Sequence, residues 1–136
     1  EDALDFLARH LDRLDWAPCA DRVAIHLPCT QRNVVRSTPA LRRLLAAVPG
    51  LQVTELTAGS GCCGAAGAAM LEDPPRAAGY RQPLIDQFAS SGATRLLSAN
   101  LGCRLHLAGA TAVPVEHPLE FLLRLARIKN PLPTPP

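Results

Sequence analysis

No run of apolar residues in this sequence approaches the roughly 18 that a membrane-spanning helix requires. The first ten residues, EDALDFLARH, are acidic, whereas a secretory signal peptide begins with a basic stretch and continues with an apolar one. Nothing in the sequence directs export, so we expect a cytoplasmic protein that reaches the inner membrane only through partners. The net charge of +2 is small and the basic residues are scattered, so charge predicts neither nucleic acid nor a membrane surface as a partner.

The 136 residues suffice for one domain with a single core, and they contain no internal repeat. With 48% apolar and 19% charged residues, the composition is typical of an ordinary globular protein. We predict one domain over 1–130. The last residues, 131–136, are rich in proline and offer no core material, so we predict a flexible tail there.

Closely spaced cysteine pairs of the C-x2-C kind, which are usual in structural zinc sites, are also missing. The chain instead has Cys19, Cys29, Cys62, Cys63 and Cys103, an odd number without an export signal. Thiols in such a protein normally stay reduced, so metal binding or redox chemistry is favoured over a disulfide scaffold.

The apolar pattern alternates between strand-like and helix-like segments. Leucines at helical spacing predict an amphipathic helix from Leu4 to Leu14. Further helices are expected over 38–50, 65–72, from Pro75 to Gly92, 104–107 and 118–128, and strands over 22–27, 51–56, 94–100 and, more weakly, 111–117. This order predicts an α/β layered domain, with a mostly parallel sheet of about four strands flanked by helices.

Four of the cysteines follow predicted strands: Cys29, the pair Cys62 and Cys63, and Cys103. The carboxyl ends of parallel strands share one edge of the sheet, where ligands bind in α/β folds. The topology therefore predicts a metal site at this edge. Cys19 precedes the first of these strands, and we interpret it as a structural thiol.

Four thiolates suit either zinc or an iron–sulfur cluster. Neighbouring residues point their side chains apart, so Cys62 and Cys63 would strain their loop to reach one small ion. A multinuclear cluster offers them separate irons, and the surrounding glycines remove side chains that would block it. We expect Gly64 to Gly67 and Gly102 to Arg104 each to open a helix whose amides face the thiolates.

Three motifs, HLPC (26–29), CCGAAG (62–67) and SANLGC (98–103), resemble the cysteine-rich CCG domain family, which includes the B subunit of heterodisulfide reductase. The resemblance covers about 22–128, and the segment from 98 to 122 looks most like the C-terminal CCG domain of glycolate oxidase iron–sulfur subunits. It implies electron transfer within an oxidoreductase, beside a flavin-containing 2-hydroxyacid dehydrogenase subunit. It also implies an upstream ferredoxin-like domain, so we expect a C-terminal piece of a longer chain.

The resemblance implies a [4Fe-4S] cluster on Cys29, Cys62, Cys63 and Cys103, and no catalytic residue is predicted in this chain. His26, Asn100 and Gly64 are candidates for the surroundings of the cluster rather than for ligands. A lone strand histidine such as His26 is more often a packing residue. Asn100 is more simply explained as a residue that closes the turn after the third strand.

The fullest family pattern is C, CC and then CxxC, and Asn100 stands at the first cysteine of the closing pair. The specialised noncubane cluster of the family is therefore not expected, and either a simpler cluster or zinc stays open. One alternative is a zinc-binding structural or docking module without redox activity. A second is a heterodisulfide reductase-like thiol/disulfide redox domain, which Asn100 makes less favourable.

Overall fold

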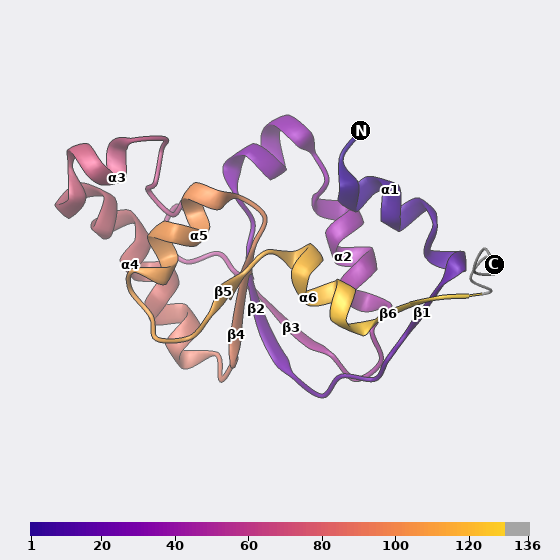
Figure 1. The fold of residues 1–136 in the computed structure, drawn as a ribbon. Helices are drawn as coiled ribbons and strands as arrows, with labels where there is room; N and C mark the ends of the chain where they lie inside the picture. The colour runs from indigo at the N-terminus through magenta and orange to yellow at the C-terminus, as the bar shows by residue number, and fades with distance from the viewer. Residues whose placement is uncertain (130–136) are drawn as a thin grey trace, which may run out of the picture.

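A four-stranded parallel sheet forms the centre of the computed structural model, which describes residues 1–129 (Figure 1). The predicted tail over 131–136 lies outside the described residues. The strands are β2 (Arg22–His26), β3 (Gln52–Leu56), β4 (Arg95–Ser98) and β5 (Val115–Glu116), in the spatial order β3-β2-β4-β5. The predicted α/β class and the parallel four-stranded sheet are thereby confirmed.

The strand order reverses between β2 and β4. The chain passes from β2 to β3 on one side, and then crosses back to β4 and β5 on the other side. The last residues of β2 and β4, His26 and Ser98, are paired across this boundary. In open α/β sheets, such a switch point opens a crevice at the carboxyl ends of the strands.

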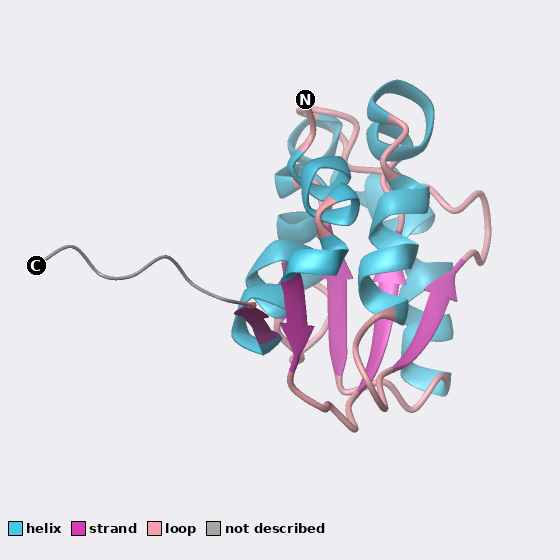
Figure 2. Ribbon diagram, turned by 90° about the vertical axis from the view of Figure 1, so that its right-hand side faces the viewer, coloured by secondary structure: helices cyan, strands magenta, loops and turns pink. Residues whose placement is uncertain are grey.

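Helices cover both faces of the sheet (Figures 1 and 2). On one face α1 (Ala3–Arg9), α2 (Thr38–Ala46) and α6 (Pro118–Leu125) pack against Val23 and Ile25, whereas α4 (Pro74–Ser90) and α5 (Leu101–Ala108) pack against Ala24 on the other. Alternate residues of a strand point to opposite faces, so a strand covered on both sides is apolar throughout. This explains the continuous apolar run of β2.

The predicted helices at the two ends are too long. The opening helix ends at Arg9 and is followed by a 3-10 turn (Leu11–Arg13) and by β1 (Leu14–Trp16), which pairs antiparallel with β6 (Ala126–Ile128). The last helix therefore ends at Leu125 instead of 128. Backbone hydrogen bonds between the two distant segments stabilise this ribbon, and leucine spacing carries no information about such pairing.

The loop after β3 contains less helix than predicted. Instead of a helix over 65–72 there is only α3 (Ala69–Glu72). The reason is that Gly64, Ala66 and Gly67 all adopt positive φ values, which a right-handed helix does not allow.

Two local features shape the connections to the helices. The loop over 30–37, which follows β2, contains a π-helical turn (Gln31–Val35). Pro74 opens α4, where a missing amide hydrogen costs nothing. Among the helices of residues 1–129, none is long and apolar enough to cross a bilayer.

Candidate metal centre

Three buried side chains from three different segments meet at the carboxyl edge of the sheet. His26 is the last residue of β2, Cys63 lies in the loop after β3, and Cys103 lies in the first turn of α5 after β4. One ligand atom from each lies within 4.8 Å of the other two. These residues are only 1%, 3% and 7% exposed. Nitrogen and sulfur atoms in such a group suit zinc or an iron–sulfur cluster.

The sulfur atoms of Cys63 and Cys103 are 2.9 Å apart and form a hydrogen-bonded pair. The hydrogen bond with Cys103 lowers the pKa of Cys63 to about 7, burial opposes this shift, and the Ala65 amide supports it. The same hydrogen bond raises the pKa of Cys103, and burial adds to the effect. The two thiols therefore titrate as a pair, and one of them loses its proton more easily than a free thiol does.

The imidazole of His26 is held in one orientation. Its Nδ1 lies 3.1 Å from the hydroxyl of Ser98, which is fully buried. Its Nε2 is buried and has no hydrogen-bond partner within residues 1–129. Burial lowers the pKa of His26 to about 4, a weak polar contact with the Gly61 backbone opposes this shift, and the charge of Arg32 adds to it, so the ring is neutral at pH 7. A neutral imidazole with one nitrogen fixed and the other unpartnered fits a metal ligand.

The other two predicted ligands lie at the same edge but outside this tight group. Cys29, three residues after the end of β2, is exposed, and Cys62 is half-buried. The charges of Cys29 and Cys62 raise the pKa of Cys103, so both lie near enough to act on the buried pair. Among the described residues the five cysteines form no disulfide. The structure thus brings two of the four predicted cysteines into contact, with the other two around them.

Cys62 and Cys63 face different surroundings, as expected for neighbouring residues. Cys63 packs in the core between the sheet and α4, together with Cys103. Cys62 lines an open pocket beside α4, with Arg76 and Tyr80 on its wall. Two thiols that diverge in this way would meet different atoms of a bound group.

Gly64 fixes the course of the loop that carries the two cysteines. Its φ is +82°, and a Cβ atom there would lie 2.6 Å from the carbonyl oxygen of Ala77 and 2.7 Å from Cβ of Tyr80. Only glycine therefore fits against α4 at this position. The amides of Gly64 and Ala65 point at the sulfurs of Cys62 and Cys63, at 3.4 and 3.5 Å. The expected amide contacts are present at Gly64 and Ala65, although a turn rather than a helix makes them. Those expected from Gly102 to Arg104 are not, because the amides of Cys103 and Arg104 bond to Asn100.

Asn100 caps the helix that carries Cys103. Its Oδ1 accepts a hydrogen bond of 3.0 Å from the Cys103 amide, which agrees with the interpretation that it closes the turn after the strand.

Cys19 lies apart from this edge, and its amide bonds to the carbonyl of Pro49. Sequence patterns assigned no role to Ser98. Ser98 is recognised only because it lies opposite His26 in the pairing of β2 with β4, and the sequence does not reveal this register.

The comparison with known proteins agrees with the motifs. The cysteine-rich domain family CCG matches residues 23–108, a range that contains all four predicted ligands. The glycolate oxidase iron-sulfur subunit of Escherichia coli (strain K12) is 29% identical over 101 residues, which cover 74% of this chain and 25% of that protein. The C subunit of the anaerobic glycerol-3-phosphate dehydrogenase of the same strain is 32% identical over 125 residues, which cover 88% of this chain and 31% of that protein. The chain spans about a quarter to a third of the length of these relatives.

Proposed function

Because this chain belongs to the CCG cysteine-rich domain family, we propose that it holds an iron–sulfur cluster and transfers electrons within a larger oxidoreductase. The observation that carries this proposal is the buried group of His26, Cys63 and Cys103, in which one imidazole nitrogen lacks a partner among residues 1–129. A buried polar atom without a partner is costly; a sulfur of the cluster would accept a hydrogen bond from this nitrogen, just as a single zinc ion would bind it.

In this proposal Cys29, Cys62, Cys63 and Cys103 are the ligands. A cluster of this kind supplies reversible one-electron exchange, at a potential that hydrogen bonds to its sulfurs and burial adjust. The protein contributes both: the loop amides of Gly64 and Ala65 face the thiols, and burial keeps water from Cys63 and Cys103. No residue of this chain is assigned a catalytic step.

The partner that we propose is a flavin-containing subunit that oxidises a 2-hydroxy acid of the glycolate type, with a ferredoxin-like domain upstream in the same chain. The similarity to the iron-sulfur subunit of a glycolate oxidase supports this choice. The similarity to one of the subunits of a glycerol-3-phosphate dehydrogenase is compatible with a related role beside another dehydrogenase. The complex would be cytoplasmic or attached to the inner membrane through its partners.

A zinc-binding structural or docking module is the second candidate. The specific observation in its favour is the compactness of the buried group, since one nitrogen and two sulfur atoms within 4.8 Å suit a single tetrahedral ion. Either Cys29 or Cys62 would complete the four ligands. Such a module would lose its fold when the metal is removed.

Metal analysis on protein purified without oxygen separates the two candidates. Iron, sulfide and zinc per chain would be measured together with visible and paramagnetic resonance spectra. About four irons and four sulfides per chain, with broad visible absorbance, would support the electron-transfer proposal. One zinc without iron would favour the docking module. Protein that retains neither metal after anaerobic reconstitution would contradict both.

A further inference from the structure

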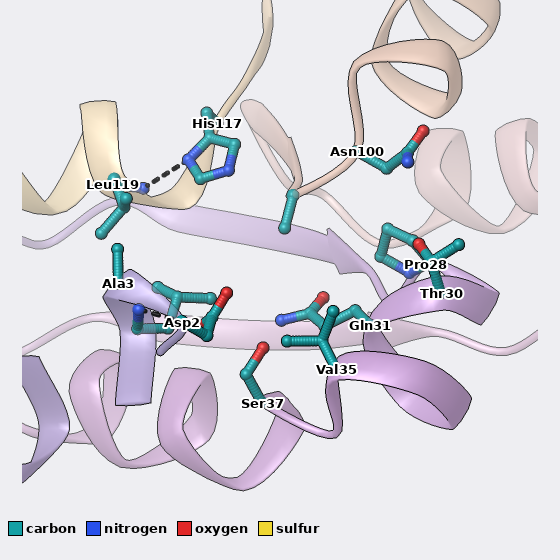
Figure 3. A pocket seen from close by; sticks show the side chains of 12 residues that line it. Asp2, Ala3, Pro28, Thr30, Gln31, Val35, Ser37, Asn100, His117 and Leu119 are labelled. Atoms are coloured by element: carbon teal, nitrogen blue, oxygen red, sulfur yellow. Dashed lines mark hydrogen bonds between the residues drawn. The ribbon is translucent and has the colours of Figure 1, made fainter. Parts of the chain in front are cut away.

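A second cavity opens at the same edge of the sheet, on the side of α1, α2 and α6 (Figure 3). It lies between the segments that follow β2 and β4, where the strand order reverses, and its volume is about 190 Å³. None of the four proposed cysteine ligands lines it. Switch-point crevices are the usual ligand sites of open α/β sheets, so this cavity is a candidate site of its own.

Gln31 supplies the clearest sign of a ligand. Its side chain lines the cavity and the residue is 4% exposed, yet both its amide oxygen and its amide nitrogen are buried without a hydrogen-bond partner in residues 1–129. Figure 3 shows the amide group between Asp2 and Val35. Each unsatisfied buried polar group costs about 1–3 kcal/mol. A leucine of similar size would avoid that cost, so the amide indicates a polar occupant.

The helix ends around the cavity favour negative charge near them, whereas the wall on the other side carries the carboxylate of Asp2. Three residues that line it, Ser37, Asn100 and His117, are the N-caps of α2, α5 and α6, so the positive ends of these helices lie around it. Asn100 uses its oxygen to cap α5, and its NH₂ group has no partner within the described part of the chain. The Ser37 side chain makes no capping bond either. Hydrogen-bond donors thus accompany the helix ends.

Two features restrict the charge and the shape of the ligand. No lysine or arginine of residues 1–129 lines the cavity, so only the helix ends can balance an anion, and they balance the single charge of a carboxylate better than the two charges of phosphate. The carboxylate of Asp2 lies on the wall and accepts hydrogen bonds from the amides of Leu4 and Asp5. The Asp2 carboxylate can accept further hydrogen bonds, so a ligand with a hydrogen-bond donor fits beside it. The volume is below the roughly 300 Å³ of pockets for drug-sized molecules, so the ligand is small.

We propose that this cavity binds a short carboxylate with a hydrogen-bond donor next to the carboxyl group, such as a 2-hydroxy acid or a 2-amino acid. The carboxylate lies toward the amide groups of Gln31 and Asn100, and the donor lies toward Asp2. This goes beyond the proposed function, because the site needs none of the metal ligands. Asn100 connects the two sites, since it lines the cavity and caps the helix that carries Cys103.

Isothermal titration calorimetry of the metal-loaded protein with lactate, alanine, propionate and phosphate tests this proposal. We expect saturable binding of lactate or alanine, about tenfold or more weaker binding of propionate, which lacks the donor, and no binding of phosphate. Tighter binding of lactate would identify the ligand as a 2-hydroxy acid, and tighter binding of alanine would identify it as a 2-amino acid. Equal affinity for propionate, tighter binding of phosphate, or no binding of any of the four would overturn the proposal.

Two variants connect binding to the named residues. Gln31→Leu should weaken binding at least about tenfold, leave the metal content unchanged and raise the unfolding midpoint without ligand, because it removes unsatisfied buried groups. Gln82→Leu is the matched control, since Gln82 is on α4 and bonds to Asp86. Asp2→Asn, which retains an N-cap for α1, should reduce the preference for lactate or alanine over propionate. Unchanged affinity in Gln31→Leu, or an unchanged preference in Asp2→Asn, would contradict the assignment, whatever the metal content.

Discussion

The hydroxyl of Ser98 lies 3.1 Å from Nδ1 of His26, and this contact joins the carboxyl ends of the two central strands. It fixes the ring beside the pair of Cys63 and Cys103, and leaves Nε2 without a partner in the described residues. Groups that orient an imidazole at a metal centre in this way are often as important as the ligands themselves. The contact therefore gives a direct test of the proposed centre.

Ser98→Ala should weaken metal retention about tenfold, because the imidazole of His26 loses the partner that orients it. The measurement is chelator competition on anaerobic protein. Ser91→Ala removes a hydroxyl that bonds to the Phe88 carbonyl at the C-terminal end of α4, and serves as the matched control. Equal metal retention in the two variants would show that the Ser98 contact has only a structural role.

The cysteines provide a second test. Cys62→Ser and Cys63→Ser should each lower metal occupancy at least about tenfold, as should Cys103→Ser, because each removes a proposed ligand. Cys19→Ser should leave occupancy unchanged, since Cys19 packs against the core away from the carboxyl edge. Iron and zinc per chain are the readout. Similar losses in Cys19→Ser and Cys63→Ser would mean that the centre has been placed wrongly.

The metal-free protein should lose stability in acid through His26. Its pKa is about 4 in the folded chain, against 6.5 for a free histidine side chain, so the unfolded chain binds an extra proton between these values. The free energy of unfolding should thus fall by about 3 kcal/mol as the pH drops from 6.5 to 4. Denaturant unfolding at a series of pH values measures this slope. His26→Gln should flatten it.

Gly64→Ala should destabilise the protein by about 2 kcal/mol or more and lower its metal content. The added methyl group would clash with the Ala77 carbonyl and with Tyr80, and the positive φ adds strain. Gly67→Ala is the control: it has a φ of +66° with no atom within 4 Å, so only the backbone cost of about 1 kcal/mol remains. Thermal unfolding with metal analysis compares the two. Equal effects would show that packing against α4 contributes nothing.

Local signals in the sequence were enough for the order of the elements and for the fold class. Apolar periodicity distinguishes helices from strands, and their alternation predicts a parallel sheet. The signals failed where distant segments pair. In the ribbon of β1 and β6, Leu14 lies opposite Ile128 and Trp16 lies opposite Ala126, and helical leucine spacing does not reveal this register.

The convergence of the cysteines could be predicted in part. Because Cys29, Cys62, Cys63 and Cys103 each follow a predicted strand, the parallel topology was enough to expect them at one edge. The motifs also identified the family, which the match over residues 23–108 confirms. Their role as a complete ligand set stays a prediction.

Only the tertiary structure decided which groups touch. It placed His26 opposite Ser98, brought Cys63 against Cys103, and left both amide atoms of Gln31 buried without a partner among residues 1–129. These relationships depend on strand register and on packing between segments far apart in the chain, whereas sequence patterns report mainly on neighbours. The sequence by itself determined the order of the main elements, the fold class and the family, and the packing of those elements decided the geometry of the two sites.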